Sequence, residues 1–293
     1  MVAARVLLGL LLVFPALSSP EKDWDRIKAK ADVIWGEGWG SSVEEADREA
    51  LAALSSRISV AVTSDFRSVE GQLSTSHGTE YLSRRSSTLR VASTATLANT
   101  GRIVLKTGRR AHVGRWIHRS ELDALILSRE QRVLEYEDAA QEAEEERWIG
   151  DALRFHYWAY VLLRSLPKPS VLRDADGRML LVAVPESMNR ILDGISVRTT
   201  KEGNRLRLSF RYDGCPVRNL SFVCFTGAGW SPRTEVSAGV ATVELAPGAL
   251  GEIVQLKVEY KYEADAEMDP ELSELLKVTE IRPLGKAQII FRR

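Results

Sequence analysis

Residues 35–54 read WGEGWGSSVEEADREALAAL, and this stretch decides the fold of the N-terminal part of the chain. It carries a regular run of glycines, at Gly36, Gly38 and Gly40. Residues 32–38 indicate a first strand, and a helical pattern follows the glycines at once. Glycine permits left-handed or strained backbone angles and close packing of strand on helix. We therefore expect a strand, a glycine turn that includes Trp39, and a closely packed helix.

The helix after this turn has a recognisable start and one apolar face. Ser41 and Ser42 are good N-cap residues, and Ser41 and Glu44 have the spacing of a capping box. Apolar side chains then recur at helical steps, at Val43, Ala46, Ala50, Leu54 and Ile58. From Ile58 the apolar period changes to two, which predicts a strand over residues 58–66.

The glycine run does not predict a nucleotide site. A dinucleotide-binding loop has the pattern G-x-G-x-x-G between strand and helix, whereas the spacing here is G-x-G-x-G. Glu37 and the acidic first turn of the helix put negative charge where a phosphate would lie, and Trp39 is bulky inside the loop. The glycines are therefore interpreted as a steric feature.

Alternating segments complete an N-terminal domain. Strands are expected at residues 102–106 and 111–118, with Gly108 between them, and alternation at residues 89–97 indicates another. We predict a small β-α-β-β-β domain over residues 19–119, as the first part of an α+β chain.

Residues 120–169 predict an antiparallel helical hairpin. Apolar residues recur at helical spacing from Leu122 to Ala143, with Arg129 in a gap of the series. The acidic run at residues 142–146 is typical of a solvated helix face. Gly150 then interrupts the pattern before a second helix.

Four aromatic side chains gather on this second helix, at Phe155, Tyr157, Trp158 and Tyr160. Neighbouring helix positions point to different sides, so some of these rings must contact another element. Two interpretations stay open: packing against a neighbouring domain, and a surface that binds a partner.

Residues 170–293 predict an antiparallel, β-sandwich-like domain. Short strands separated by turn signals are expected at residues 195–200, 205–211, 220–225, 241–245, 253–262 and 287–291. Helices are expected at residues 186–193 and 270–278.

The N-terminus has the order of features found in a signal peptide. Arg5 precedes a short apolar run at residues 6–14, and the small residues Ala16 and Ser18 follow. The run is shorter than the about 20 residues that span a bilayer. We expect residues 1–18 to be a signal peptide; the alternative is a buried N-terminal helix. No later segment is long and apolar enough to predict a transmembrane span.

The two cysteines are Cys215 and Cys224. In an exported chain they are expected to form a disulfide, because export leads to oxidising surroundings. The alternative is a pair of buried free thiols on neighbouring strands.

Composition and motifs exclude several function classes. Lys+Arg and Asp+Glu both number 40, so the chain lacks the basic excess typical of nucleic-acid binding. His112 and His118 share a strand face with Trp116, but few carboxylates lie near them for a metal site. No G-x-S-x-G elbow is present. We expect no catalytic residues, no metal and no cofactor.

Two segments resemble known families. GEGWGSSVEEADREALAALSSRISVAV, residues 36–62, resembles the Lpp-twenty lipoprotein family of Gram-negative envelopes. That resemblance, which extends over residues 32–122, implies a scaffolding role without catalytic residues. Many members are lipid-anchored on a cysteine, and none lies near the expected cleavage site here. Residues 149–167 resemble the second helix of a tetratricopeptide repeat; a plain helical hairpin is the alternative.

The sequence thus predicts an exported, non-enzymatic envelope protein, periplasmic or secreted, of a Gram-negative bacterium. A scaffolding or macromolecule-binding role is expected, with envelope proteins or cell-wall components as partners. The alternative is a periplasmic or secreted enzyme or small-molecule binder acting on a glycan or peptide. Two carboxylates converging in one cleft would indicate that alternative.

Overall fold

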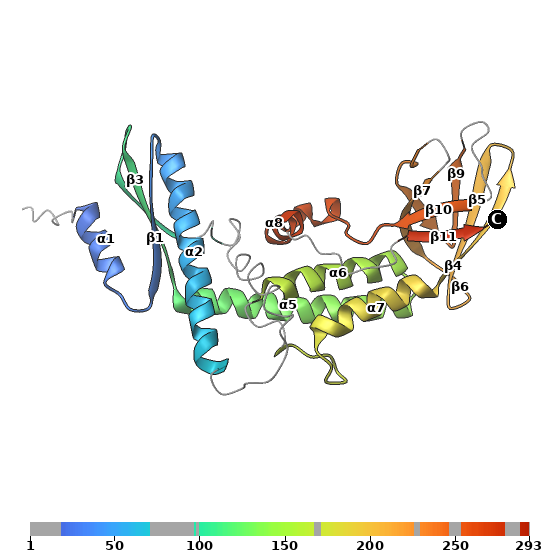
Figure 1. The fold of residues 1–293 in the computed structure, drawn as a ribbon, viewed down its shortest axis with the longest axis horizontal. Coiled ribbons are helices and arrows are strands. Elements are labelled where there is room, and N and C mark those ends of the chain that lie inside the picture. The colour runs from blue at the N-terminus through green and yellow to red at the C-terminus, as the bar shows by residue number, and fades with distance from the viewer. Residues whose placement is uncertain are drawn as a thin grey trace, which may run out of the picture. The chain divides into compact units, whose positions relative to one another are not determined.

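The computed structural model describes residues 19–70, 97, 100–166, 171–225, 229–245, 253–278 and 288–292. It has the predicted α+β class, with helices and two antiparallel sheets (Figure 1). The chain forms two compact units. Unit 1 holds the described residues up to Leu54 together with Gly101–His118, and unit 2 holds the others. The expected signal peptide and, apart from Leu97, the strand expected at residues 89–97 lie outside the described residues.

Unit 1 is a three-stranded sheet with a helix packed on each face. Its strands follow the order β1-β3-β2, and both pairings are antiparallel. In chain order its elements are α1 (Pro20–Lys28), β1 (Val33–Gly40), the first part of α2 (Val43–Glu70), β2 (Gly101–Lys106) and β3 (Ala111–His118). The strands predicted at residues 32–38, 102–106 and 111–118 are confirmed within one or two residues at their ends.

The glycines of β1 are the surface on which α2 packs. A Cβ atom on Gly38 would lie 2.1 Å from the carbonyl oxygen of Ala46 and 2.2 Å from the backbone nitrogen of Ala50. A Cβ atom on Gly36 would lie 2.4 Å from the backbone nitrogen of Leu54. The strand and helix backbones therefore touch directly, which only glycine permits. Close strand–helix packing is thus confirmed.

The expected glycine turn is wrong. Gly36, Gly38 and Gly40 lie inside β1, and none of them has a positive φ. The chain instead turns at Ser41 and Ser42. The capping box lies one residue later than predicted: the Ser42 hydroxyl accepts from the Glu45 amide at 3.2 Å, and the Glu45 carboxylate accepts from the Ser41 amide at 2.7 Å.

The strand predicted over residues 58–66 is also wrong, because α2 continues through it. Ile58 is fully buried and extends the helical spacing of Ala50 and Leu54, whereas Val60 is 66% exposed. The Ser59 hydroxyl donates to the Ser55 carbonyl at 3.0 Å, one helical turn earlier. The apparent period of two came from β-branched residues that the helix places on different sides.

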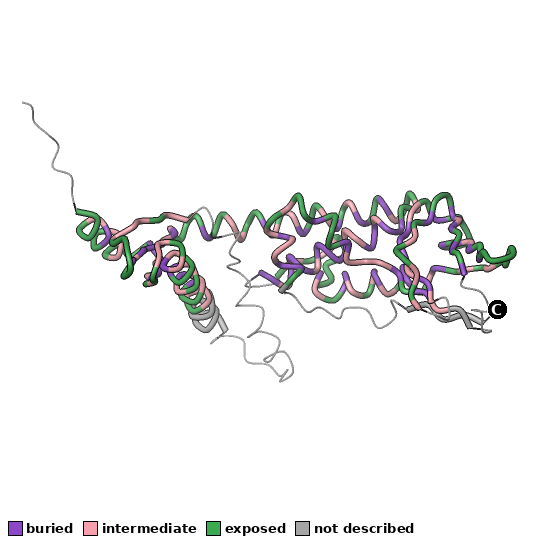
Figure 2. The backbone as a smooth tube through the Cα atoms, turned by 90° about the horizontal axis from the view of Figure 1, so that it is seen from above, coloured by how far each residue is buried: buried purple, intermediate pink, exposed green. Residues whose placement is uncertain are grey.

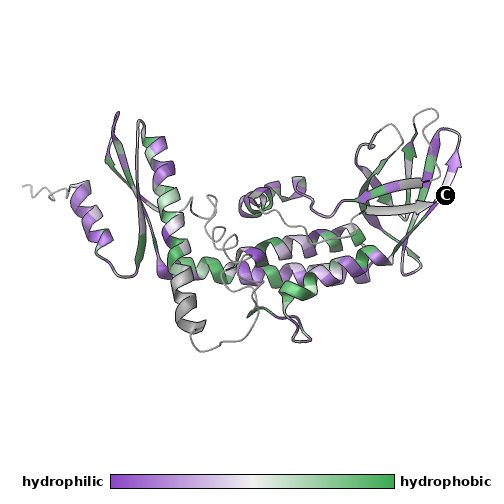
Figure 3. Ribbon diagram, viewed as in Figure 1, coloured by the Kyte–Doolittle hydropathy of each residue, from purple (hydrophilic) through white to green (hydrophobic). Residues whose placement is uncertain are grey.

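The opposite face of the sheet is covered by α1 through one buried side chain, Trp24. Its ring lies 5.9 Å from Trp35 and 6.1 Å from Trp116, and it covers Gly114, where a Cβ atom would clash with the indole. Its indole nitrogen donates to the Glu37 carboxylate. Most of α1 is hydrophilic (Figure 3), so Trp24 supplies most of its apolar contact.

A buried ion pair also fixes α2 to the sheet. The Arg115 guanidinium on β3 is 7% exposed and donates to both carboxylate oxygens of Asp47, at 2.7 and 2.8 Å. Arg102 on β2 adds a third contact at 3.2 Å. The hydrogen bond from Arg115 holds the pKa of Asp47 below its usual value.

Unit 2 joins the helical hairpin and the C-terminal strands in one hydrophobic core. The predicted hairpin is confirmed as α5 (Arg119–Glu145) and α6 (Ile149–Ser165), followed by α7 (Leu180–Gly194). Figure 2 shows buried and exposed segments alternating along these helices. The helix predicted at residues 186–193 is longer than expected and includes Pro185. Because core residues come from the hairpin and the strands alike, neither is a separate body.

The C-terminal strands form one curled antiparallel sheet in the order β11-β10-β7-β8-β9-β5-β4, which is the form that the predicted sandwich-like domain takes. Its strands are β4 (Ile195–Glu202), β5 (Arg205–Tyr212), β6 (Cys215–Pro216), β7 (Asn219–Phe225), β8 (Thr234–Ser237), β9 (Val240–Glu244), β10 (Ile253–Val258) and β11 (Gln288–Arg292). β6 pairs with β5 beside this order, and neither β6 nor β8 was predicted. The strand predicted at residues 253–262 ends at Val258. A 3₁₀ helix, η2 (Ala264–Met268), precedes α8 (Pro270–Val278), whose predicted bounds are confirmed.

Ion pairs attach α8 to the hairpin. Arg129, which fills the gap in the apolar series of α5, is 2% exposed and donates to the Glu271 carboxylate at 2.7 Å and to the Ser165 hydroxyl at 3.2 Å. Arg132 binds both Glu271 and Asp269. A buried guanidinium is tolerated because its charge is paired and hydrogen-bonded.

We predict that Gly38→Ala destabilises unit 1 by about 3 kcal/mol or prevents its folding, because a methyl group would push apart two backbones. Denaturant unfolding monitored by tryptophan fluorescence measures the effect. Gly229→Ala is the control, since no atom lies within 4 Å of the added Cβ there. Equal unfolding midpoints for the two variants would contradict the strand–helix contact.

Asp47→Asn should lower the free energy of unfolding by about 3 kcal/mol at pH 7, because it removes the carboxylate that pairs with the buried Arg115 charge. The folded pKa of Asp47 lies below the unfolded value of about 3.9, so wild type holds this stabilisation above that value. Wild type loses this stabilisation as pH falls through the folded pKa of Asp47.

Unfolding curves of wild type and Asp47→Asn between pH 7 and pH 2 should therefore converge at the acid end. Glu49→Gln, an exposed substitution on the same helix, should leave the curves unchanged. A difference in the free energy of unfolding between Asp47→Asn and wild type that does not change with pH would contradict a stabilising role for the ionised Asp47 carboxylate.

Candidate functional site

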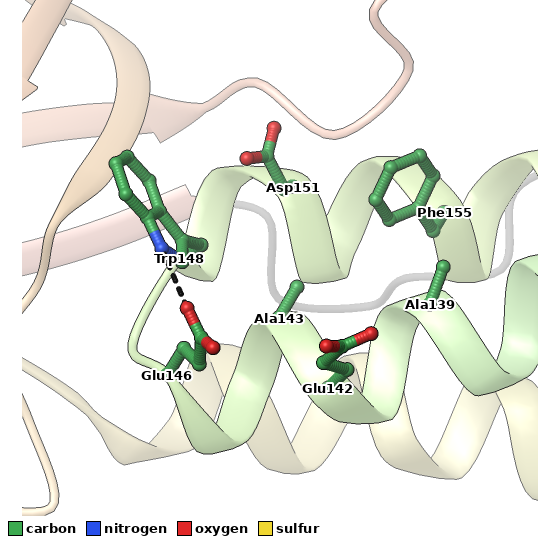
Figure 4. A pocket seen from close by; sticks show the side chains of 7 residues that line it. All are labelled: Ala139, Glu142, Ala143, Glu146, Trp148, Asp151 and Phe155. Atoms are coloured by element: carbon green, nitrogen blue, oxygen red, sulfur yellow. Dashed lines mark hydrogen bonds between the residues drawn. The ribbon is translucent and has the colours of Figure 1, made fainter.

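A groove of about 280 Å³ lies between the end of α5 and the start of α6 (Figure 4). Its lining residues are Ala139, Glu142, Ala143, Glu146, Trp148, Asp151 and Phe155. Two alanines on α5 give the groove its depth, because their short side chains leave room between the helices. Two aromatic rings and three carboxylates therefore surround a small apolar floor.

The turn between α5 and α6 sets the position of Trp148. Arg147 has φ 68°, and the Trp148 amide donates to the Ala143 carbonyl at 2.8 Å, the pattern of a Schellman cap. The Arg147 guanidinium donates to the Glu144 carbonyl at 3.1 Å and lies 5.6 Å from the centre of the Tyr212 ring. These contacts hold a residue type that is unusual in the left-handed region and direct Trp148 to the groove.

The expectation that Gly150 interrupts the hairpin is wrong. Gly150 is the second residue of α6, and a Cβ atom there would lie 2.6 Å from the Tyr262 hydroxyl oxygen. Its amide donates to the Asn219 side chain at 3.0 Å. Glycine is needed for close packing against the sheet, and the turn itself is made by Arg147.

Negative charge accumulates at the end of α5. Its last turn contains no basic residue, although the carbonyl groups there already favour a cation. Glu144 is compensated, since it accepts from the Tyr212 hydroxyl at 2.5 Å and from Arg190 at 2.9 Å. Burial alone would raise the pKa of Glu144, but the hydrogen bonds from Arg190 and Tyr212 lower it overall.

The two glutamates that line the groove are less well compensated. Glu146 lies 3.6 Å from Arg218, and both side chains are 55% exposed, which makes the pair weak. Within the part of the chain that the structure describes, no hydrogen bond or ion pair reaches the Glu142 carboxylate. Glu142 and Glu146 are also four residues apart on one side of the helix end, where like charges repel.

Both groove rings already carry a guanidinium from the chain itself. Arg218 lies 5.5 Å from the centre of the Trp148 ring, and Arg154 lies 4.8 Å from that of Phe155. Trp148 remains 38% exposed, and its indole nitrogen donates to Glu146 at 3.2 Å (Figure 4). Such rings attract cations through their π-electron faces.

The structure separates the four aromatic residues that the sequence grouped together. Tyr157 and Trp158 are in the core, where Tyr157 contacts Tyr260 and the Trp158 indole donates to the Lys261 carbonyl at 2.9 Å. These two rings are therefore not available to a partner. Tyr160 is half-buried against the same core, and Phe155 alone of the four lines the groove.

The histidines make local contacts. His112 stacks on the exposed Trp39 ring at 4.6 Å, and the His118 ring lies 2.9 Å from Asp32. His156 is buried in unit 2 with its Nδ1 atom 3.0 Å from Glu137. No group of three or more His, Cys, Asp and Glu side chains in the described ranges is arranged to hold a metal.

The predicted disulfide between Cys215 and Cys224 is wrong, because both residues carry free thiols. Cys224 faces the core from β7 and is fully buried, while Cys215 is exposed on the short strand β6. Burial raises the pKa of the Cys224 thiol to about 11. The alternative of two buried thiols is correct only for Cys224.

Among the helices that the structure describes, none is long and apolar enough to cross a membrane. Comparison of the chain with protein-family models, curated proteins and solved structures finds no match. The resemblance to the Lpp-twenty family therefore stays an expectation from the sequence.

The acidic run at residues 142–146 was interpreted as a solvated helix face, and Glu142, Glu145 and Glu146 are exposed as expected. The groove beside this run was not predicted. The available signal was the closeness of this acidic run to Trp148 at the hairpin turn. That signal becomes specific only when α6 is placed beside α5, which brings Phe155 to the same site.

A thiol reagent should modify only Cys215 in the native protein, because Cys224 is buried and protonated. In denaturant without reductant, two thiols should react, and Cys215→Ser should abolish the native reaction. Mass spectrometry of the labelled protein measures both stoichiometries. If no thiol reacts in the denatured chain, Cys215 and Cys224 form a disulfide and the free-thiol assignment is wrong.

Proposed function

We propose that this chain is an exported, non-enzymatic protein of a Gram-negative cell envelope that binds another macromolecule in a scaffolding role. The observation that carries the proposal is the groove between α5 and α6. It joins an exposed tryptophan, a half-buried phenylalanine and carboxylates that the fold does not fully compensate. Aromatic anchors are typical of interaction sites, and exposed charges that the fold does not use can pair with charges of opposite sign on a partner.

Other charged clusters have a structural use, which supports a role without catalysis. Asp47 and Arg115 fix a helix to a sheet, and Arg129 and Glu271 fix α8 to the hairpin. Each of these side chains is held in ion pairs or hydrogen bonds that define the fold. The groove differs, because Glu142 makes no such contact within the described residues.

The envelope location rests on the sequence. The order of features at residues 1–18 and the resemblance of residues 36–62 to the Lpp-twenty family both favour export and a scaffolding role. Envelope proteins or cell-wall components are therefore the partners that we propose.

The alternative, an enzyme or small-molecule binder for a glycan or peptide, would use two converging carboxylates. Glu142 and Asp151 lie on different helices of the groove, and Figure 4 shows their carboxylates pointing in different directions. Asp151 is also engaged by Arg154 at 2.9 Å. This geometry favours binding over acid–base chemistry.

Photo-cross-linking in the cell tests the proposal. A photoreactive amino acid in place of Ala139 should give a discrete adduct with an envelope macromolecule, because this position lies in the groove. The same amino acid in place of the exposed Thr200 on β4 is the matched control and should give none. Gel shift and mass spectrometry identify the adduct.

Fractionation of the same cells tests the location. The chain should lie outside the cytoplasm and lack residues 1–18. A wholly cytosolic chain, or equal adducts at Ala139 and Thr200, would defeat the proposed function.

A further inference from the structure

We infer that the groove between α5 and α6 binds a lysine or arginine side chain presented by a basic segment of a partner protein. This inference rests on the proposed function and names the chemistry of its partner.

The shape suits a long side chain with a cationic end. Ala139 and Ala143 form a shallow apolar floor, which can accept the methylene groups of a lysine or arginine. Trp148, which is 38% exposed, stands at one end of the α6 side and offers a ring face to the charge. Phe155 stands at the other end, where its ring already contacts Tyr136 and Arg154, and adds apolar surface (Figure 4).

The negative charge of the groove favours a cationic ligand. Glu142, Glu146 and Asp151 line it, and the chain supplies Arg218 and Arg154 only beside the last two. Glu142 has no partner among the described residues. The negative end of the α5 macrodipole and the repulsion between Glu142 and Glu146 both raise the free energy of the groove when no cation is bound. A bound ammonium or guanidinium group would relieve both.

The chain itself shows that these rings accept cations. Arg218 and Arg154 lie over Trp148 and Phe155 at 5.5 and 4.8 Å. The exposed contact between Arg218 and Glu146 is weak enough to exchange for an incoming side chain.

The size of the groove favours a segment of protein over a free small molecule. Sites for small ligands bury about 70–90% of the ligand's surface, whereas this groove of about 280 Å³ is open to solvent. One lysine or arginine side chain fills the groove. Useful affinity must therefore come from further contacts made by the partner protein that carries this side chain.

Binding of a defined peptide to the full-length chain tests the inference. The probe is a short fluorescein-labelled peptide of glycine, serine and alanine that carries two lysines, measured by fluorescence anisotropy. It should bind saturably and weaken with added salt. The same peptide with norleucine in place of lysine should not bind, and n-butylamine should compete only poorly.

Matched variants locate the site. Glu142→Gln should weaken binding by about fivefold, and Trp148→Leu, which removes the exposed ring of the groove, by about threefold. Glu145→Gln removes an equal charge from the same helix end but from a residue outside the groove, so it should leave affinity within about twofold. Circular dichroism of each variant verifies that it is folded.

Several results would overturn the inference: no binding of the lysine peptide, equal binding of the norleucine peptide, equal effects of Glu142→Gln and Glu145→Gln, or full competition by n-butylamine. The outcome is separable from that of the proposed function. An adduct at Ala139 without lysine-peptide binding removes only this inference, whereas absence of the adduct removes the function itself.

Discussion

The carboxylate of Glu144 ties together three elements of unit 2. It lies at the end of α5, accepts a hydrogen bond from Tyr212 on β5, and pairs with Arg190 on α7. The Glu144 side chain is 14% exposed and its bond to Tyr212 is partly buried, whereas the Arg190 side chain is 57% exposed, so the bond to Tyr212 is the better shielded of the two contacts. The end of the hairpin therefore cannot leave the sheet without breaking them. The turn at Arg147, and with it the position of Trp148, depends on this attachment.

Carboxylates within a single helix turn have opposite roles. Glu144 is satisfied by the fold, whereas Glu142 faces an open groove without a cation from the described chain, at a helix end that already favours positive charge. Folded proteins keep an unfavourable charge of this kind mainly where function requires it. The conflict is small in energy, so the hairpin core and the ion pairs of Arg129 can hold the helix in place. The groove thus remains prepared for a ligand that supplies the missing charge.

Local patterns were enough to predict several elements, and tertiary contacts decided the others. Pro270–Val278 was predicted with its exact bounds because a proline and an apolar period mark it. Residues 58–66 were misassigned because β-branched side chains mimic a strand when the continuing face of Ala50, Leu54 and Ile58 is ignored. The glycines of β1 were recognised as steric but placed in a turn. The groove could not be predicted, since Phe155 and Glu142 meet only across the packed hairpin.

The free energy of unfolding of Glu142→Gln, compared with that of Glu144→Gln, tests the account most directly. Glu144→Gln should lower stability by about 1–3 kcal/mol, because it weakens the hydrogen bonds that the largely buried Glu144 carboxylate accepts from Tyr212 and Arg190. Glu142→Gln should raise stability by about 0.5 kcal/mol, because it removes a repulsive charge from a helix end. A loss of stability in Glu142→Gln as large as that in Glu144→Gln would show that both carboxylates serve the fold, and would contradict the account.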